Sequence, residues 1–223
     1  MLSPEFIRGP LFKFSLLIFI LGMVYRFFRI LFMGWKKDYA PPRGSAWGGI
    51  IKTYTKSLIF LPFLPPKFPS ARHRPLTYVA GGLFHVGLFA AIFLLAPHIE
   101  TWRTLLGFGW PALPTPLVDG LAVVAIVGLI TLASNRMINP VTKMLTGPAD
   151  WLNIIFVLLP LITGWAMYHH IFGLNYTKLT NLHLLTVNWL LIWTPFSRIS
   201  HFLTYFITKT MHGAKFGRLG VEP

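Results

Sequence analysis

Residues 182–207, LHLLTVNWLLIWTPFSRISHFLTYFI, decide the fold, because this stretch is long, apolar and carries one histidine near each end. His183 and His201 lie 18 residues apart. At about 3.6 residues per turn this is roughly five turns, so a continuous helix would place both imidazoles on one face, about 27 Å apart. A helix of this length and apolarity is typical of a membrane span. The two histidines are therefore candidate axial ligands of hemes, one near each membrane surface.

Composition places the whole chain in the membrane class. Its 223 residues are 54% hydrophobic and 12% charged, whereas soluble domains carry about 25% charged residues. Cysteine is absent, which excludes disulfides, Cys-ligated zinc, iron–sulfur clusters held by this chain and covalently attached c-type heme. The 8 histidines remain as metal ligands. The net charge of +14 lies mainly in loops between apolar runs, which indicates membrane topology rather than nucleic-acid binding.

The apolar runs predict an all-α integral membrane protein, a single domain of residues 1–223. Within the basic segment 36–75, residues 47–63 predict either an amphipathic interfacial helix or an irregular loop that docks on a partner. The basic tail from Lys209 onward contains glycine and is expected to be mobile. Five transmembrane helices are predicted, at residues 11–32, 76–96, 117–133, 151–168 and 182–207.

Lysine and arginine are distributed unequally between the two sides of these five spans. Thirteen lie in the segment 36–75, in the loop between the third and fourth spans and in the tail, whereas four lie on the opposite side. Cytoplasmic loops of membrane proteins carry the excess of basic residues. This pattern predicts an N-terminus that faces outward and a C-terminus that faces the cytoplasm.

The predicted topology suggests which histidines meet. His85 in the second span and His201 in the fifth both fall in the cytoplasmic half, so they are the predicted ligands of a heme b between helices two and five. Ionisable side chains inside a span are rare and usually functional. Arg198 lies three residues before His201 and needs a negative partner. A heme propionate would serve, and a lipid phosphate or a loop carbonyl is the alternative.

A second heme b is predicted near the outer surface, with His183 and His98 as candidate ligands. His98 follows the helical histidine at position 85 by 13 residues, a rotation of roughly 220° on a straight helix. The two histidines do not share a face unless Pro97 breaks the helix. His169 and His170 lie at the same depth, where a histidine is more often an interfacial polar residue than a ligand. Together with Lys178 they could accept the protons of a quinol such as menaquinone.

Two motifs resemble those of the gamma subunit of respiratory nitrate reductase: LFHVG at residues 83–87 and PFSRISH at residues 195–201. The resemblance implies a five-helix di-heme cytochrome b that carries electrons between the quinone pool, or periplasmic carriers, and a cytoplasmic iron–sulfur or catalytic subunit. His85 and His201 match the ligands of the cytoplasmic-side heme, and His183 matches one ligand of the outer heme. The family has its other outer ligand where this chain has Leu95, and His98 is the nearest substitute.

The basic first cytoplasmic loop, the chain length and the lack of cysteine are more similar to the gamma-like cytochrome b subunits of transmembrane redox complexes in sulfate reducers, such as the high-molecular-weight cytochrome c complex. That resemblance implies a periplasmic multiheme cytochrome c, a cytoplasmic iron–sulfur subunit and other membrane subunits as partners. Whether the chain also oxidises quinol stays open. The alternative is a heme-free membrane anchor for soluble redox subunits. A transporter with histidine proton relays lacks support, because the spans carry almost no acidic residue and show no inverted repeat.

Overall fold

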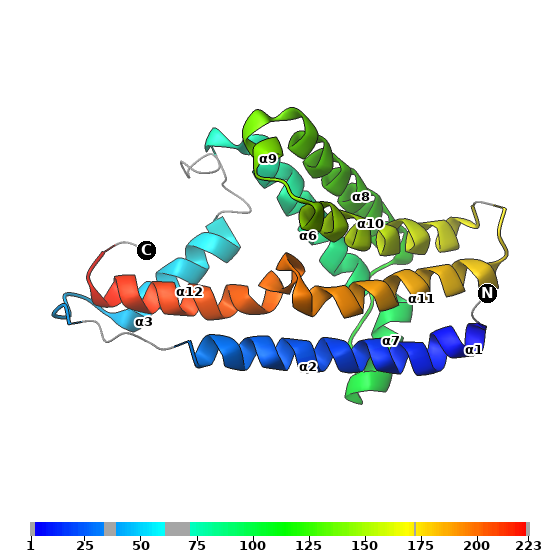
Figure 1. Cartoon of the computed structure of the whole chain (residues 1–223), viewed down its shortest axis with the longest axis horizontal. Coiled ribbons are helices and arrows are strands. Elements are labelled where there is room, and N and C mark those ends of the chain that lie inside the picture. Colours follow the sequence, from blue (N-terminus) through cyan, green and yellow to red (C-terminus); the bar gives the residue numbers. More distant parts are fainter. Residues whose placement is uncertain (1–2, 34–38, 61–71, 172, 222–223) are drawn as a thin grey trace. The chain divides into compact units, whose positions relative to one another are not determined.

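The computed structural model describes residues 3–33, 39–60, 72–171 and 173–221, and every regular element within these ranges is a helix (Figure 1). Residues 34–38 and 61–71 of the predicted basic loop lie outside the described residues. Two compact units make up the chain. The first joins Met1–Phe12 to Arg74–Leu190, and the second joins Lys13–His73 to Leu191–Pro223.

The described residues contain four helices long and apolar enough to cross a membrane. These are Pro4–Leu31, Pro75–Leu94, Thr115–Ile138 and Pro148–His169, and they make the chain a multi-pass membrane protein. They correspond to the first four predicted spans. The fifth predicted span contributes α11 (Tyr176–Trp193), which is more polar because it carries Lys178, His183 and Asn188. Asn188 is only 1% exposed, so α11 turns polar groups inward. The prediction of five spans and of their orientation stays a prediction.

Proline begins most helices of the first unit. Its missing N–H costs nothing in the first turn, and its fixed φ suits a helix start. Among the described residues of this unit, six α-helices carry proline at their first or second position: α1 (Pro4–Phe6), α6 (Pro75–Leu94), α7 (Ala96–Leu106), α8 (Thr115–Ile138), α9 (Pro140–Met144) and α10 (Pro148–His169). At α10 the Asp150 carboxylate also accepts the Gly147 N–H at 3.0 Å. The short α1 (Pro4–Phe6) and the π-helical turn η1 (Ile7–Leu11) complete this unit.

Small residues bring α6 and α8 into close contact, and the two helices lie side by side (Figure 1). A Cβ atom added to Gly87 would lie 2.8 Å from the Cβ of Ala125, and one added to Gly128 would lie 2.8 Å from the carbonyl oxygen of Ala80. Helices in a membrane associate through such close backbone approach, because lipid offers no hydrophobic drive to pack. Of the three glycines that flank His85 in the sequence, Gly87 therefore serves helix packing. A Cβ added to Gly81 or Gly82 meets no atom within 4 Å.

The predicted continuous helix over residues 182–207 is interrupted. Helix α11 ends at Trp193, the 3₁₀ turns η4 (Thr194–Phe196) and η5 (Arg198–Ser200) follow, and α12 (His201–Arg218) begins at His201. Pro195 causes the break, because it has no N–H to donate and its ring clashes with the carbonyl one turn earlier. Ser197 is extended, with φ −123° and ψ 176°. The expectation that His183 and His201 share one face of one helix is therefore wrong.

The serines of this break satisfy its backbone groups. The hydroxyl of Ser197 donates to the Thr194 carbonyl at 3.2 Å, and its oxygen accepts the Ile199 N–H at 3.2 Å. Ser200 donates to the Ser197 carbonyl at 2.8 Å. Both serines are buried, so these bonds supply the partners that a buried backbone requires.

The second unit contains α2 (Phe12–Leu31), α3 (Ala46–Tyr54), the π-helical turn η2 (Thr55–Phe60) and α12. Residues 47–60 are helical, in α3 and η2, and their position in the interface plane stays a prediction. Helix α3 packs on α12 through glycines: a Cβ added to Gly49 would lie 2.5 Å from the Cα of Gly217. The hydroxyl of Tyr54 donates to the Phe206 carbonyl at 2.8 Å. The prediction of a mobile tail is wrong up to Arg218, because these contacts hold α12 against α3.

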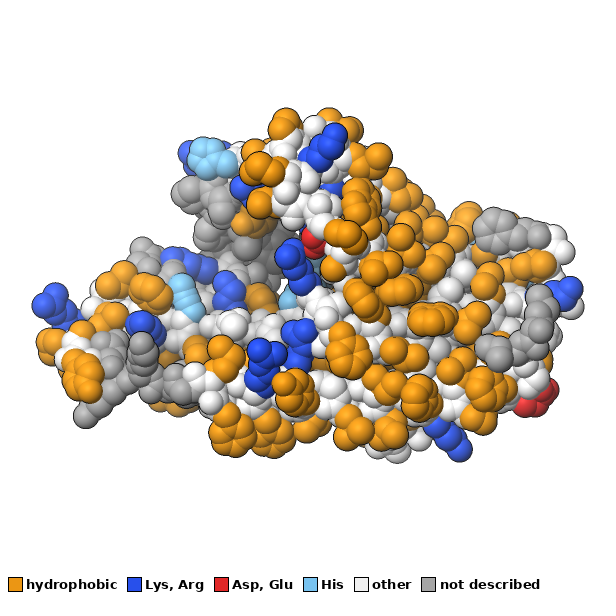
Figure 2. Space-filling view, viewed as in Figure 1, with side chains coloured by type: hydrophobic (Ala, Val, Ile, Leu, Met, Phe, Trp, Pro, Cys, Tyr) orange, Lys and Arg blue, Asp and Glu red, His pale blue; other side chains and the backbone are white. Residues whose placement is uncertain are grey.

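The molecular surface is apolar over most of the visible face (Figure 2). Leu83 and Val86 of α6 and Val127 of α8 are 48%, 57% and 57% exposed. A soluble domain rarely exposes contiguous apolar area of this kind. In a membrane these side chains face lipid, which agrees with the four apolar helices.

Candidate functional site

The candidate site lies in the first unit, where the break between α6 and α7 positions His98. Helix α6 ends at Leu94, Leu95 is extended with φ −85° and ψ 129°, and α7 begins at Ala96 with Pro97 in its first turn. The helix is therefore broken before His98, at Leu95 rather than at Pro97. Because of this break, the direction of the His98 side chain does not follow from the helical rotation of α6. The Nδ1 atom of His98 lies 2.5 Å from the carbonyl oxygen of Ala91.

This hydrogen bond determines which nitrogen of His98 can bind a metal. A carbonyl oxygen only accepts, so Nδ1 must carry the proton. The other ring nitrogen, Nε2, then has the lone pair that a metal ion requires. An Nδ1–H bond to a backbone carbonyl is the usual support of a metal-ligating histidine, because it fixes the tautomer and the ring orientation.

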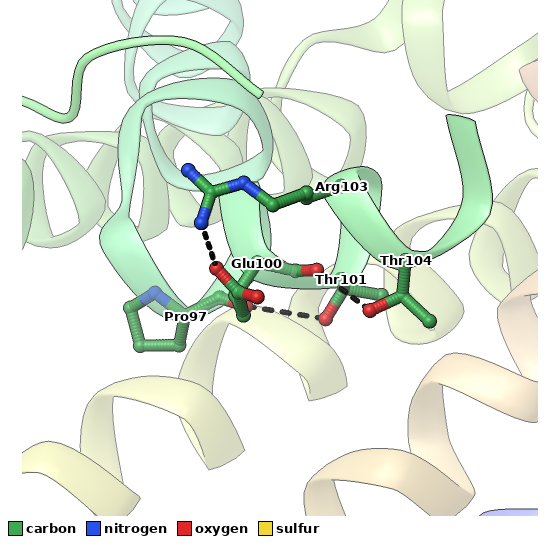
Figure 3. A network of polar contacts seen from close by, with 5 residues as sticks. All are labelled: Pro97, Glu100, Thr101, Arg103 and Thr104. Atoms are coloured by element: carbon green, nitrogen blue, oxygen red, sulfur yellow. Dashed lines mark hydrogen bonds and ion pairs between the residues drawn. The ribbon is translucent and has the colours of Figure 1, made fainter. Parts of the chain in front are cut away.

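Helix α7 is anchored around His98 by its own polar contacts. Arg103 forms an ion pair with Glu100 at 2.8 Å, and both side chains are more than half exposed. The hydroxyls of Thr101 and Thr104 donate to the carbonyls of Pro97 and Glu100, at 3.1 and 3.0 Å (Figure 3). An exposed ion pair adds little stability, but together these groups give α7 a solvated side one turn beyond His98. This segment is therefore more polar than the four long apolar helices.

His183 of α11 is held by threonine hydroxyls. Its Nδ1 lies 3.1 Å from Oγ1 of Thr163 on α10. The hydroxyl proton of Thr163 goes to the Leu159 carbonyl at 2.8 Å, and Thr186 gives its own proton to the His183 carbonyl at 2.7 Å. The Thr163 oxygen is thus left to accept, and His183 Nδ1 donates to it. His183 is in the same tautomer as His98, with Nε2 as the available metal ligand.

The lack of a side chain at Gly164 allows the His183 ring to pack directly against the backbone of α10. A Cβ atom added there would lie 3.1 Å from Cε1 and 3.3 Å from Nδ1 of His183. Any larger residue would push on the imidazole, so the ring is confined between the Gly164 backbone and the Thr163 hydroxyl. Thr163 is buried and His183 is half-buried. The ring orientation is therefore fixed by α10.

The two imidazoles meet as a parallel pair. Their ring centroids are 6.1 Å apart and their planes differ by 14°. Two neutral imidazoles close together are a donor set that a heme b could take in a chain without cysteine. No group of three or more His, Asp or Glu in the described ranges is arranged to hold a metal ion.

His85 and His201 each bond a backbone carbonyl in the same way, one in each unit. Nδ1 of His85 lies 2.6 Å from the Gly81 carbonyl oxygen, and Nδ1 of His201 lies 2.9 Å from that of Arg198. Both rings thus have the tautomer that suits ligation through Nε2. The heme predicted between His85 and His201 stays a prediction. Arg198 is exposed and begins the turn η5, and its carbonyl orients His201.

The other interfacial histidines take different partners. His169, at the end of α10, places Nε2 3.0 and 3.1 Å from the two carboxylate oxygens of Asp119 on α8. His170 ends α10 in the left-handed conformation, with φ 52°. Lys178 is exposed in the first turn of α11. A His–carboxylate pair can take up or pass a proton, so His169 suits the predicted proton-accepting role better than that of an axial ligand.

Sequence reasoning missed the groups that orient His98 and His183. Thr163 lies 20 positions from His183, and Ala91 contributes only its backbone. Thr163 lies four residues after Leu159 and three after Pro160, which is the spacing of helical neighbours, but nothing in the sequence links Thr163 to His183. Asp119 was recognisable as a rare acidic residue at a span end, although its partner was not.

Comparison with known proteins gives one relative. The chain is 30% identical over 221 residues to a protein of Nitratidesulfovibrio vulgaris (strain Hildenborough), and the match covers 97% of this chain and 92% of that protein. The name of that protein states no function. No family model matches the chain, and no solved structure matches it. The organism is a sulfate reducer, which agrees with the resemblance drawn from the sequence motifs.

Proposed function

We propose that this chain, which belongs to the family of the Nitratidesulfovibrio vulgaris protein, is a b-type cytochrome subunit of a membrane-bound respiratory redox complex. It would transfer electrons across the bacterial inner membrane between a periplasmic multiheme cytochrome c, or the quinone pool, and a cytoplasmic iron–sulfur subunit. The proposal gives the chain no bond-making chemistry beyond quinol oxidation.

One observation carries the proposal: the parallel imidazoles of His98 and His183, 6.1 Å apart and inclined by 14°. The Nδ1 atoms of the two rings lie on the Ala91 carbonyl and the Thr163 hydroxyl, so each ring would keep Nε2 for a metal. A metal-ligating histidine usually has this support, because it fixes the direction of Nε2. The donor set also fits heme b in a chain without cysteine, where covalent attachment is excluded.

The residues of the site would hold and tune the cofactor. A bis-histidine heme b exchanges one electron and needs no open coordination position. His98 and His183 would supply the axial nitrogens. The Ala91 carbonyl and the Thr163 hydroxyl would keep both rings in the ligating tautomer and increase their basicity. Gly164 would admit the His183 ring close to α10, and the surrounding apolar helices would exclude water.

His85 and His201 would hold a second heme in the same manner. Their Nδ1 bonds to the Gly81 and Arg198 carbonyls support this. Arg198 would lie beside that heme and offer its guanidinium to a propionate. The menaquinone site is a separate expectation, favoured by the hydrogen-bonded His169 and Asp119, a pair able to accept a quinol proton.

The decisive experiment counts hemes in the purified chain and in its histidine variants. A reduced-minus-oxidised visible spectrum with a pyridine hemochrome assay should show two hemes b per wild-type chain. His98→Ala and His183→Ala should each remove the same single heme, and the double variant should remove no more than either alone. His85→Ala or His201→Ala should remove the other heme.

The control is His212→Ala, because His212 is exposed and its ring contacts Phe216 within α12. It should retain both hemes. Absence of heme from the wild-type chain, in membranes of cells that load other b-type cytochromes, would favour the heme-free anchor instead. Loss of different hemes in His98→Ala and His183→Ala would show that the two rings do not share one iron.

A further inference from the structure

A pocket of about 200 Å³ lies in the second unit, between the end of α2 and the break before α12. It is lined by Gly22, Tyr25, Arg26, Arg29, Pro195 and Phe196. Gly22 permits the contact of α2 with Pro195, because a Cβ added there would meet the proline ring. The pocket thus exists because the same proline that interrupts the helix of residues 182–207 packs against a glycine.

Two arginines, one turn apart on α2, give the pocket its charge. Nε of Arg26 donates to the Pro195 carbonyl, which anchors one edge of its guanidinium and leaves the two terminal nitrogens for another acceptor. Arg29 is exposed at the same face. Adjacent guanidinium groups are suited to phosphate, since their planar donors match its oxygens in pairs.

The described residues of this unit offer no carboxylate to these arginines. Residues 13–33, 39–60, 72–73 and 191–221, which are its described part, contain no Asp or Glu. Two like charges three residues apart repel each other. An anion from outside this part of the chain would relieve that repulsion.

The depth and the rim of the pocket indicate which anion. Arg26 and Arg29 lie in the last two turns of the apolar helix Pro4–Leu31, where a span reaches the headgroup layer. The rim residues Tyr25 and Phe196 are 64% and 67% exposed. Aromatic side chains at this depth are typical of the membrane interface. A ligand here meets cations at its head and apolar rings beside its tail.

We propose that this pocket binds the phosphate of an anionic phospholipid headgroup, with Arg26 and Arg29 as its cationic donors and Tyr25 and Phe196 beside the first carbons of the acyl chains. Basic pockets at the ends of membrane helices recognise acidic lipids through the same combination. The lipid would neutralise the arginine pair and join α2 to the Pro195 break from the membrane side. This assignment does not depend on heme.

The test is lipid titration of the full chain in detergent, followed by native mass spectrometry with phosphatidylglycerol and, separately, phosphatidylcholine. One phosphatidylglycerol should bind to the wild-type chain in preference to phosphatidylcholine. Arg29→Gln should weaken that binding about fivefold, and Arg26→Gln with Arg29→Gln about thirtyfold, from about 1 kcal/mol per basic residue at a lipid surface. Arg29→Gln keeps the Arg26 contact with Pro195, so it tests the site without disturbing the break.

The matched control is the double variant Lys13→Gln with Lys143→Gln, which removes the same charge from two exposed positions outside the pocket and should bind lipid as the wild type does. Equal losses in the control and the arginine variants would overturn the proposal. So would equal binding of phosphatidylcholine. Displacement of phosphatidylglycerol by millimolar inorganic phosphate would overturn the lipid assignment in favour of free phosphate.

Discussion

The hydrogen bond from His183 to Thr163 makes a sharp prediction for Thr163→Val. The change keeps the shape of the side chain but removes the oxygen 3.1 Å from Nδ1 of His183. The ring N–H then loses its acceptor in a half-buried site, which costs about 1–3 kcal/mol. Because that N–H fixes the tautomer, under the proposed function the affinity for heme should fall about 10–100-fold, the usual effect of losing a hydrogen bond to a metal-ligating histidine.

The assay is transfer of heme from the purified chain to an excess of apomyoglobin, followed by absorbance. Thr163→Ser is the matched control, since it retains the hydroxyl and should release heme at the wild-type rate. Thr186→Val is the second control, because the Thr186 hydroxyl donates to the His183 carbonyl rather than to the ring. Equal release rates in Thr163→Val and Thr163→Ser would refute the role given to this oxygen, and with it the tautomer argument for His183.

Three further outcomes are expected. Gly164→Ala should leave the free energy of unfolding within about 1 kcal/mol of the wild type, because helix propensity favours alanine. It should nevertheless shift the midpoint potential of one heme, since the new Cβ lies 3.1 Å from the His183 ring. A potentiometric titration that matches the wild type would contradict this. Gly128→Val should destabilise the α6–α8 contact by about 1–3 kcal/mol, measured by denaturation in mixed detergent. Gly120→Ala should not, because its added Cβ meets nothing within 4 Å. Equal denaturation midpoints for the two variants would show that the glycine contact is unimportant. Asp119→Asn should change stability by less than about 1 kcal/mol, because the pair with His169 is partly exposed, and should keep both hemes in the hemochrome assay; a lost heme would make His169 part of a heme site.

The helical membrane character of the chain was predictable, because apolar runs long enough to span a bilayer have few alternatives to a helix. The interruption at residues 194–200 was also within reach of the sequence. Pro195 is a strong breaker, but the five-turn spacing of His183 and His201 favoured a continuous helix. The spacing of two residues predicts a shared helix face only where the backbone hydrogen bonds continue between them. A proline between the two residues interrupts these bonds.

The sequence was enough to select His98 and His183 as candidates, but not the groups that orient them. His98 and His183 were chosen because both fall near the outer surface, and depth follows from span boundaries. The groups that orient them could not be chosen in the same way. Thr163 belongs to another helix, and the Ala91 carbonyl is a backbone atom available at every residue, so only the packing of α10 against α11 and the break at Leu95 select them.

Under the proposed function, the anchoring of His98 and His183 bears on how heme would be inserted into the chain. Both rings are immobilised by the polypeptide itself, through bonds to a neighbouring carbonyl and hydroxyl that involve no porphyrin. The two side chains therefore lose their conformational entropy when the helices fold, and not when the cofactor binds. Under the proposed function, maturation would require no remodelling of the apoprotein, and heme supply rather than refolding would set the pace of biogenesis.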